Sequence, residues 1–290
     1  MTLTVTPSSS LFGARITGVD LVNGLDEDTF ATVRAAFDEH SVLVFPGQPM
    51  DDDQQISFSE RFGHLEGTAG VNPGTGTPFA RQSNIDIETG ATIPPDDRRM
   101  GYQKSNYLWH SDSTFKAVPS LCSVLTAREV PPEGGATEFA STRIAYEGLP
   151  DDTKARLESL VVEHDFSYSR GLTGFAFSAQ EAAEYPPVRH DLVRTNAGNG
   201  RRSLLIGAHA KAVVGWPADE SRELLDDLLA QATQSDTRLT HEWRTGDAVV
   251  WDNQAVLHRA TEYDTNRHRR LMQRTTISAG QPVRPSIGVS

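Results

Sequence analysis

The stretch AVVWDNQAVLH, residues 248–258, has the pattern of a buried strand that runs into a turn and then into His258. Short runs of this β type recur along the chain, separated by turn sequences such as VPPEGGA and TNAGNGR. Strand and helix patterns do not alternate, which fits a doubly wound parallel sheet poorly. The pattern predicts mainly β structure with flanking helices, as in a β-sandwich or jelly roll. The other runs expected as strands are ARITGVDL (14–21), SVLVF (41–45), LCSVLTA (121–127), LVVEHDFSYS (160–169), SLLIG (203–207), LTHEW (239–243) and RLMQRTTI (270–277).

Helix signals are few and lie mostly at the flanks of the strand runs. Asp26 is placed to cap one helix, and Asp51 is placed to cap a second that extends through Phe62. A third is expected at about 151–160, and a fourth after Pro217, where leucines recur at helical spacing. NAGNG (196–200) lacks the strand and helix context of a nucleotide loop and predicts a turn.

Composition limits the function. The formal net charge is −12 at pH 7, which argues against a nucleic-acid binder, because such proteins need a basic face. No apolar run approaches the roughly 18 residues of a membrane span, and the N-terminus lacks a secretory pattern. Cys122 is the only cysteine, so an internal disulfide is excluded and a reducing compartment is expected. We expect a cytoplasmic protein without nucleic-acid or membrane partners.

The chain shows no repeat and no linker, so one domain over residues 1–290 is expected. Residues 67–105 differ from the rest, being rich in Gly, Thr, Pro and Asp with one short strand-like piece, SNIDI (83–87). So long a connection usually marks a functional loop, and we expect a mobile lid there. A short flexible tail is expected from about residue 281.

This long segment leads into WHSDST (109–114), which contains a candidate metal-binding pair. If residues 107–115 are extended, His110 and Asp112 lie on one face of the strand. His258 supplies a candidate third ligand. Two histidines and one carboxylate form the facial triad that holds Fe(II) and leaves positions open, although zinc accepts the same ligand types. The alternative for H-x-D alone is a strand histidine beside a hydrogen-bonded aspartate.

RRLMQRT (269–275) adds two arginines. In a strand, Arg270 and Arg274 share a face with Met272 and would point inward. A buried guanidinium needs an anionic partner, and its planar fork matches a carboxylate. The distal carboxylate of 2-oxoglutarate would be such a partner at an oxidative Fe(II) site. Without the triad, a solvated basic strand end is the simpler explanation.

The motifs WHSDST, PPEGGATEFAS, SLLIG, GDAVVWDNQAVLH and RRLMQR, in this order, resemble the Fe(II)/2-oxoglutarate-dependent dioxygenases of the taurine dioxygenase and 2,4-dichlorophenoxyacetate dioxygenase family. The resemblance runs from about ITGVDL to TTISAG and implies a double-stranded β-helix (jelly roll) core. It implies that Trp251 packs behind the site. The site residues that it implies are the iron ligands His110, Asp112 and His258, the 2-oxoglutarate-binding residues Thr137 and Arg270, and the substrate-binding residues Arg274 and Asn106.

The resemblance also implies a reaction. Oxidation of 2-oxoglutarate by O2 to succinate and CO2 is coupled to hydroxylation of an sp3 carbon in a small anionic substrate, and a homo-oligomer is expected. RRSLLIGAHAKAVVGW (201–216) is closer to the aryloxyalkanoate branch, where hydroxylation cleaves the ether bond, although Ala208 stands where a basic residue is expected. We expect His209, the residue after Ala208, either to line the pocket or to be structural. An alkylsulfonate, amino-acid or natural-product substrate is an alternative, as is a catalytically idle protein that binds a small acid.

Overall fold

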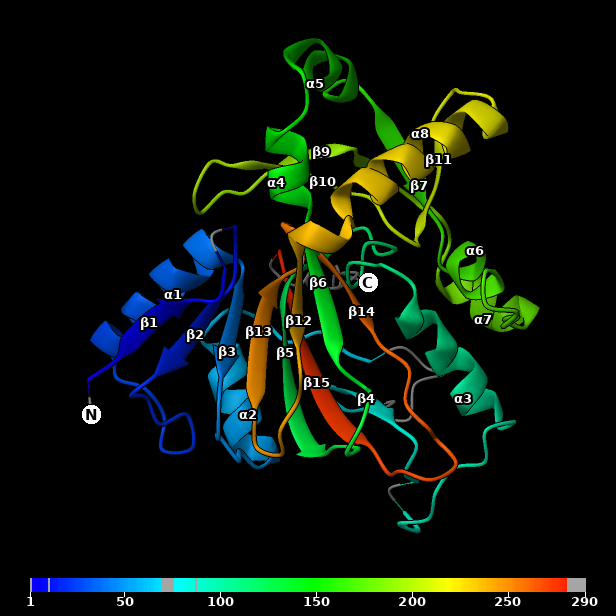
Figure 1. Ribbon diagram of the computed structural model, residues 1–290. Coiled ribbons are helices and arrows are strands. Elements are labelled where there is room, and N and C mark those ends of the chain that lie inside the picture. The colour runs from blue at the N-terminus through cyan, green and yellow to red at the C-terminus, as the bar shows by residue number, and fades with distance from the viewer. Residues whose placement is uncertain (1, 10, 69–75, 87, 281–290) are drawn as a thin grey trace, which may run out of the picture.

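The computed structural model describes residues 2–9, 11–68, 76–86 and 88–280 (Figure 1). Its centre is a seven-stranded sheet in the order β1-β2-β3-β13-β5-β15-β4, in which all neighbours are antiparallel except the parallel pair β2 and β3. The strands are β1 (Thr4–Pro7), β2 (Ala14–Thr17), β3 (Val42–Phe45), β13 (Ala248–Asp252), β5 (Ser120–Glu129), β15 (Leu271–Ser278) and β4 (Phe79–Ser83).

A second sheet, in the order β12-β6-β14, packs on one face of the first (Figure 1). Phe139 from this sheet contacts Trp251 from the large sheet, with ring centroids 5.7 Å apart, and Met272 is buried in the same layer. This apolar layer between two sheets confirms the predicted β-rich core with flanking helices. The strands are β12 (Arg238–His241), β6 (Thr137–Ser141) and β14 (Val256–Ala260).

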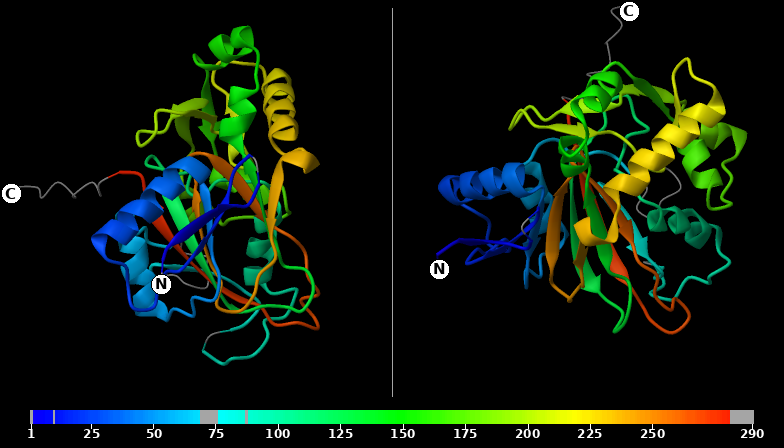
Figure 2. Two further views of the ribbon diagram at one scale, coloured as in Figure 1. Left: turned by 60° about the vertical axis from the view of Figure 1, so that its left-hand side comes forward. Right: turned by 45° about the horizontal axis from the view of Figure 1, so that its top comes forward.

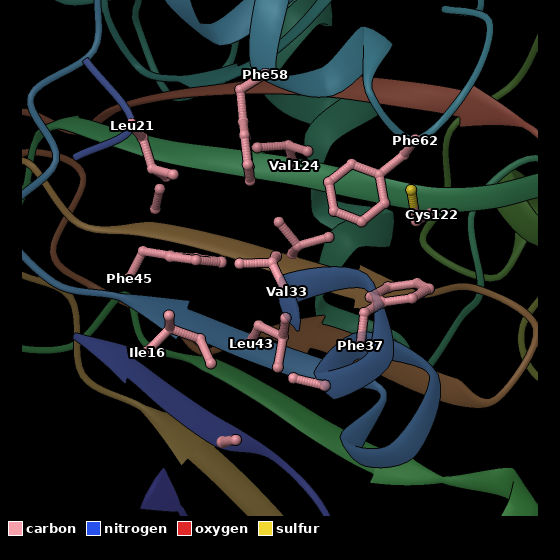
Figure 3. Packing of buried hydrophobic residues seen from close by; sticks show 14 of the residues in the cluster. Ile16, Leu21, Val33, Phe37, Leu43, Phe45, Phe58, Phe62, Cys122 and Val124 are labelled. Carbon is pink, nitrogen blue, oxygen red and sulfur yellow. The ribbon is translucent and has the colours of Figure 1, made fainter. Parts of the chain in front are cut away.

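Two helices cover the other face of the large sheet. The side chain of Asp26 accepts a hydrogen bond from the backbone N–H of Thr29 and so begins α1 (Glu27–His40). Asp51 and Gln54 form a capping box at the start of α2 (Asp52–Glu60). Both caps were predicted. Each apolar side chain that these helices bury contributes about 1.5–3 kcal/mol. Figure 3 shows this packing around Val33, Phe37, Phe45, Phe58 and Phe62.

A further layer lies across one end of the sheets (Figures 1 and 2). Helix α8 (Ala218–Ala232) begins after Pro217, as predicted, and packs with α4 and β11 around a separate apolar cluster. Residues 197–199 form the predicted turn between β9 and β10. The remaining elements here are α4 (Thr142–Glu147), α5 (Asp151–Leu157), η2 (Ser235–Thr237) and two small sheets of β11 (Ala210–Val213), β7 (Val161–His164) and β8 (Val188–Asp191), and of β10 (Arg202–Leu204) and β9 (Val193–Thr195).

The expected strand LVVEHDFSYS is only half right, because it ends at His164. The side chain of Asp165 accepts a hydrogen bond from the N–H of Tyr168 and begins helix α6 (Phe166–Gly171). An aspartate favours this capping role over a place in a strand. Helix α6 lies near α7 (Ala179–Glu184) (Figure 1). Its Phe166 contacts Tyr102 on α3 (Arg98–Gln103), with ring centroids 6.4 Å apart.

The segment 67–105 contains more regular structure than its composition indicates. Its strand, β4, overlaps the expected SNIDI strand only at Ser83, where β4 pairs with Leu271 of β15 and ends, and Ile85 forms only an isolated bridge with Thr92. Helix α3 follows and leads into η1 (Lys104–Tyr107). Residues 69–75 of the expected lid and the expected tail from 281 lie outside the described residues. The lid and the single-domain organisation stay predictions. In the described ranges no helix is long and apolar enough to cross a membrane.

Candidate active site

His110 and His258 lie side by side through backbone pairing. The N–H of His110 donates to the carbonyl of His258 at 3.1 Å, and the reverse bond is 2.8 Å, so the two residues form an isolated bridge at the edge of β14. Their ring centroids are 4.2 Å apart. Residues 107–115 are not the expected strand, since a turn with Ser113 at φ 57° follows His110. This turn, rather than strand alternation, directs Asp112 toward the histidines.

Asp112 completes a group of three potential metal ligands. Its Oδ1 lies 3.8 Å from Nε2 of His110, and its Oδ2 lies 3.6 Å from Nε2 of His258. One ligand atom from each of the three residues lies within 4.8 Å of the others, and all three side chains are buried. The structure therefore brings together the three residues that the sequence analysis selected as iron ligands.

The two imidazoles are suited to metal ligation. Nδ1 of His110 lies 2.7 Å from the carbonyl oxygen of Leu108, which leaves Nε2 directed toward the site. Both ring nitrogens of His258 are buried without a hydrogen-bond partner in the described part of the chain. Burial lowers the pKa of both histidines, so both are neutral at pH 7 and can donate a lone pair. An unsatisfied buried nitrogen is costly, and a metal ion would satisfy it.

Ser123 and Arg274 hold the Asp112 carboxylate directly, and Asn253 supports them. Oδ2 accepts from Ser123 at 2.7 Å, and Nη1 of Arg274 lies 2.5 Å from Oδ1. Asn253 accepts from the N–H of Asp112 at 3.2 Å and donates to Ser123 at 2.9 Å. Burial raises the pKa of Asp112. The positive charge of Arg274, electrostatic interactions with the two imidazoles and the Ser123 hydrogen bond lower it more, so the pKa lies well below its ordinary value. Asp112 is therefore an anion available for ligation.

Arg270 is a buried cation that forms no ion pair within the described ranges; its residue is 4% exposed. Its guanidinium donates to the carbonyls of Gln82 at 3.3 Å and Gly135 at 3.2 Å, while its Nε has no partner. Burial lowers its pKa. Gly135 has φ 69°, and a Cβ there would lie 3.2 Å from Nε of Arg270, so the glycine in PPEGGA allows this close approach. Arg270 lines a cavity of about 250 Å³.

Thr137 begins β6, whose Phe139 is paired with His258. The Thr137 hydroxyl accepts a hydrogen bond from Nε1 of Trp243 at 2.9 Å. Because the indole can only donate, the hydroxyl proton of Thr137 remains free to donate to an anion. Thr137 is 3% exposed, as expected for a residue that faces the interior of the sandwich.

A smaller cavity of about 60 Å³ adjoins the triad. His110, Asp112, Arg274 and Asn106 line it, and Asn106 also lines the cavity of Arg270. Asn106 therefore lies between the two cavities. His209 is buried in the wall of the smaller one, and burial holds its pKa well below the ordinary value.

Sequence reasoning missed several residues that position this site. Asn253 and Ser123 hold Asp112, and Trp243 holds Thr137. Trp251 behaves as predicted: it packs on His258 with ring centroids 4.6 Å apart and donates to Asn253 at 2.9 Å. The sequence signal for Asn253 was its place in the turn between two buried strands, where a polar side chain must find partners.

Comparison with known proteins places the chain in a family. Residues 4–276 match the family described as taurine catabolism dioxygenase TauD, TfdA family. The chain is 42% identical over 283 residues to the alpha-ketoglutarate-dependent 2,4-dichlorophenoxyacetate dioxygenase of Cupriavidus pinatubonensis, covering 96% of this chain and 98% of the relative. It is 37% identical over 286 residues to the (S)-phenoxypropionate/alpha-ketoglutarate-dioxygenase of Sphingobium herbicidovorans, covering 96% and 95%.

A solved structure agrees. The crystal structure of AAD-2 in complex with Mn(II) and N-oxalylglycine superposes with a TM-score of 0.89 at 37% identity, over 97% of this chain and 98% of that one. The chain belongs to the TauD, TfdA family of dioxygenases. The resemblance inferred from five short motifs is confirmed, and with it the jelly-roll fold.

Proposed function

We propose that this dioxygenase uses Fe(II) and 2-oxoglutarate to hydroxylate the ether-bearing carbon of an aryloxyalkanoate, which cleaves the ether bond. The observation that carries the proposal is the buried group of His110, Asp112 and His258, in which both ring nitrogens of His258 have no hydrogen-bond partner in the described residues. Beside it, Arg270 forms no ion pair within the same ranges and lines the neighbouring cavity. A 2-His-1-carboxylate face fits Fe(II), and an unpaired buried arginine fits a dicarboxylate co-substrate.

The residues divide into three roles. Nε2 of His110, the Asp112 carboxylate and a ring nitrogen of His258 would hold the iron, which supplies activation of O2 coupled to decarboxylation of the 2-oxo acid. Arg270 and Thr137 would bind carboxylate oxygens of 2-oxoglutarate. Their contribution is orientation, because a charged bidentate contact and a hydroxyl donor fix the co-substrate before O2 reacts.

Asn106 and Arg274 line the cavity beside the triad and would contact the substrate there. Hydroxylation of a carbon that carries an aryl ether oxygen gives a hemiacetal, which breaks into a phenol and an oxo acid. Two similar relatives are named for aryloxy acids, and this similarity favours such a substrate over an alkylsulfonate or a natural product.

A binding titration tests the cofactors. Fe(II) and then 2-oxoglutarate are added anaerobically to the metal-free protein, and a weak visible charge-transfer band of the chelated 2-oxo acid is expected. Succinate, which lacks the 2-oxo group, should give no band and serves as the control. If iron binds and 2-oxoglutarate gives no band, the roles of Thr137 and Arg270 are wrong. Release of phenol from phenoxyacetate, dependent on 2-oxoglutarate and O2, then tests the substrate class.

We also propose a cytoplasmic homo-oligomer. The single buried Cys122 supports a reducing compartment, and burial raises the pKa of its thiol well above the ordinary value, so it is unreactive. Light scattering on the purified protein measures the mass directly, and a mass of one chain, 31.7 kDa, would refute the oligomer.

A further inference from the structure

Arg170 is a buried cation that neither the motifs nor the proposed iron site uses. It lies on α6 and lines the same cavity of about 60 Å³ as Asp112 and Arg274. Its residue is 9% exposed. Phe166, four residues earlier on the same helix, lines this cavity as well, since positions i and i+4 share a helix face. Helix α6 therefore places a ring and a guanidinium in the wall of the cavity that His110 and Asp112 also line.

The carboxylates that line this cavity are already paired with other cations. Asp112 pairs with Arg274 at 2.5 Å, and Glu66 accepts from Lys116 at 2.6 Å and from Ser113 at 2.7 Å. Arg170 forms no ion pair within the described ranges, and its Nε is buried without a hydrogen-bond partner. Three cations and two carboxylates thus line the cavity, and Arg170 is the cation that has no carboxylate partner in the described residues.

Aromatic rings hold the Arg170 guanidinium in place. Its Cζ lies 4.3 Å from the ring centroid of Tyr102 and 4.7 Å from that of Phe166. Phe115 stacks on Phe166 with centroids 3.8 Å apart. Cation–π contacts offset part of the cost of burying a charge, but a buried guanidinium still lacks the anion that its planar fork can bind.

We propose that Arg170 binds the carboxylate of the substrate. The inference deepens the proposed function and rests on it: Arg170 would supply the main charge for the substrate carboxylate, and Arg274, which pairs with Asp112, would contact the substrate beside it. A cavity of about 60 Å³ holds a carboxylate and its adjacent carbon, whereas a benzene ring needs about 150 Å³. The cavity as it stands therefore fits the acid end of the substrate, and the aryl end requires lining side chains to move.

The distal carboxylate of 2-oxoglutarate has a separate partner. Arg270 lines the other cavity, of about 250 Å³, and Arg170 does not line it. The ligand of Arg170 is thus a second anion, bound on the side of the triad where Arg274 and His209 lie.

The test compares a charged ligand with a neutral one. Phenoxyacetate and phenoxyacetamide are titrated calorimetrically into the full chain loaded with Fe(II) and 2-oxoglutarate under anaerobic conditions. The wild type should bind the acid on the order of tenfold more tightly than the amide or better. Arg170→Met should weaken binding of the acid by about tenfold or more and leave binding of the amide unchanged. Unchanged acid binding, or equal losses for acid and amide, would overturn the proposal.

Two further variants keep the test sharp. Arg98→Met is the control. Arg98 lies 4.7 Å from the ring centroid of Phe175, which belongs to the same aromatic cluster, but it pairs with Glu181 and does not line the cavity. Its loss should leave both affinities unchanged. If Arg170→Met does not fold, Arg170→Lys replaces it, because lysine keeps the charge and lacks the planar fork. This variant should bind the acid more weakly than the wild type and the amide equally well. Equal affinities for the acid in this variant and the wild type would also overturn the proposal.

A wild type that gives the 2-oxoglutarate band but binds no aryloxy acid refutes the proposed substrate class and this inference together. One that binds the acid independently of Arg170 refutes the inference alone.

Discussion

Nη1 of Arg274 lies 2.5 Å from Oδ1 of Asp112, so an inward arginine from β15 neutralises the candidate iron ligand in the metal-free site. A metal ion at the triad would take over part of this neutralisation. The ion pair thus stabilises the site before the metal arrives, because a buried carboxylate without a counter-charge is costly.

Arg274→Ala tests this relationship. Removing one partner of a buried ion pair destabilises a protein by about 3–5 kcal/mol, and the loss should be smaller in the metal-loaded protein. Thermal unfolding with and without Mn(II) measures both values. An equal loss in the two states would show that Arg274 does not compensate the charge of Asp112. The variant should also weaken substrate binding more than it slows uncoupled turnover of 2-oxoglutarate.

Asp112→Ala should abolish coupled turnover, because only two neutral nitrogens would remain for the metal. Metal content after dialysis and succinate release with substrate are the measurements. Asp191→Ala, which alters an exposed carboxylate on β8, is the control and should keep wild-type values. Activity retained by the Asp112 variant would refute the triad.

Arg270→Ala should raise KM for 2-oxoglutarate by well over tenfold, since a hydrogen-bonded charged contact contributes about 1.5–3 kcal/mol. Arg269→Ala is the matched control. Arg269 is half-exposed and pairs with Glu129 at 3.0 Å, away from the cavity, so its loss should leave KM unchanged. If both variants keep the wild-type KM, another residue binds the distal carboxylate.

Trp243→Phe removes the hydrogen bond that holds the Thr137 hydroxyl. We expect KM for 2-oxoglutarate to rise about fivefold, which corresponds to a hydrogen bond of about 1 kcal/mol. The effect should vanish in a Thr137→Ala background, where the hydroxyl is already absent. A double-mutant cycle measures this coupling, and additive effects of the two changes would contradict it.

Asp252 gives a prediction about pH. Burial raises its pKa to about 6, and because the folded value exceeds the unfolded one, stability falls as pH rises through the window between them. Relative to Asp252→Asn, the wild type should lose about 1 kcal/mol of unfolding free energy between pH 5 and pH 7.5. Chemical denaturation of the metal-free proteins at both pH values measures it. A constant difference would show that Asp252 titrates normally.

Local chemistry was readable in the sequence. Asp26 and Asp51 cap helices because short acidic side chains satisfy free backbone N–H groups, an interaction within three residues. Alternation along RLMQRT placed Arg270 and Arg274 on one inward face, since side chains in a strand have a period of two. The identities of the three candidate ligands came from motifs with a similarly short reach.

Tertiary structure decided which of these side chains meet. Arg274 and Asp112 are 162 residues apart, Asn253 and Asp112 are 141 apart, and Trp243 and Thr137 are 106 apart. Such contacts depend on the register of strands that are distant in sequence and on the turn at Ser113, which replaced the expected strand. The placement of Arg170 likewise required α6 to fold against α3. A sequence specifies the local backbone and the chemistry that each side chain carries, whereas the packing of non-local elements fixes which charge faces which.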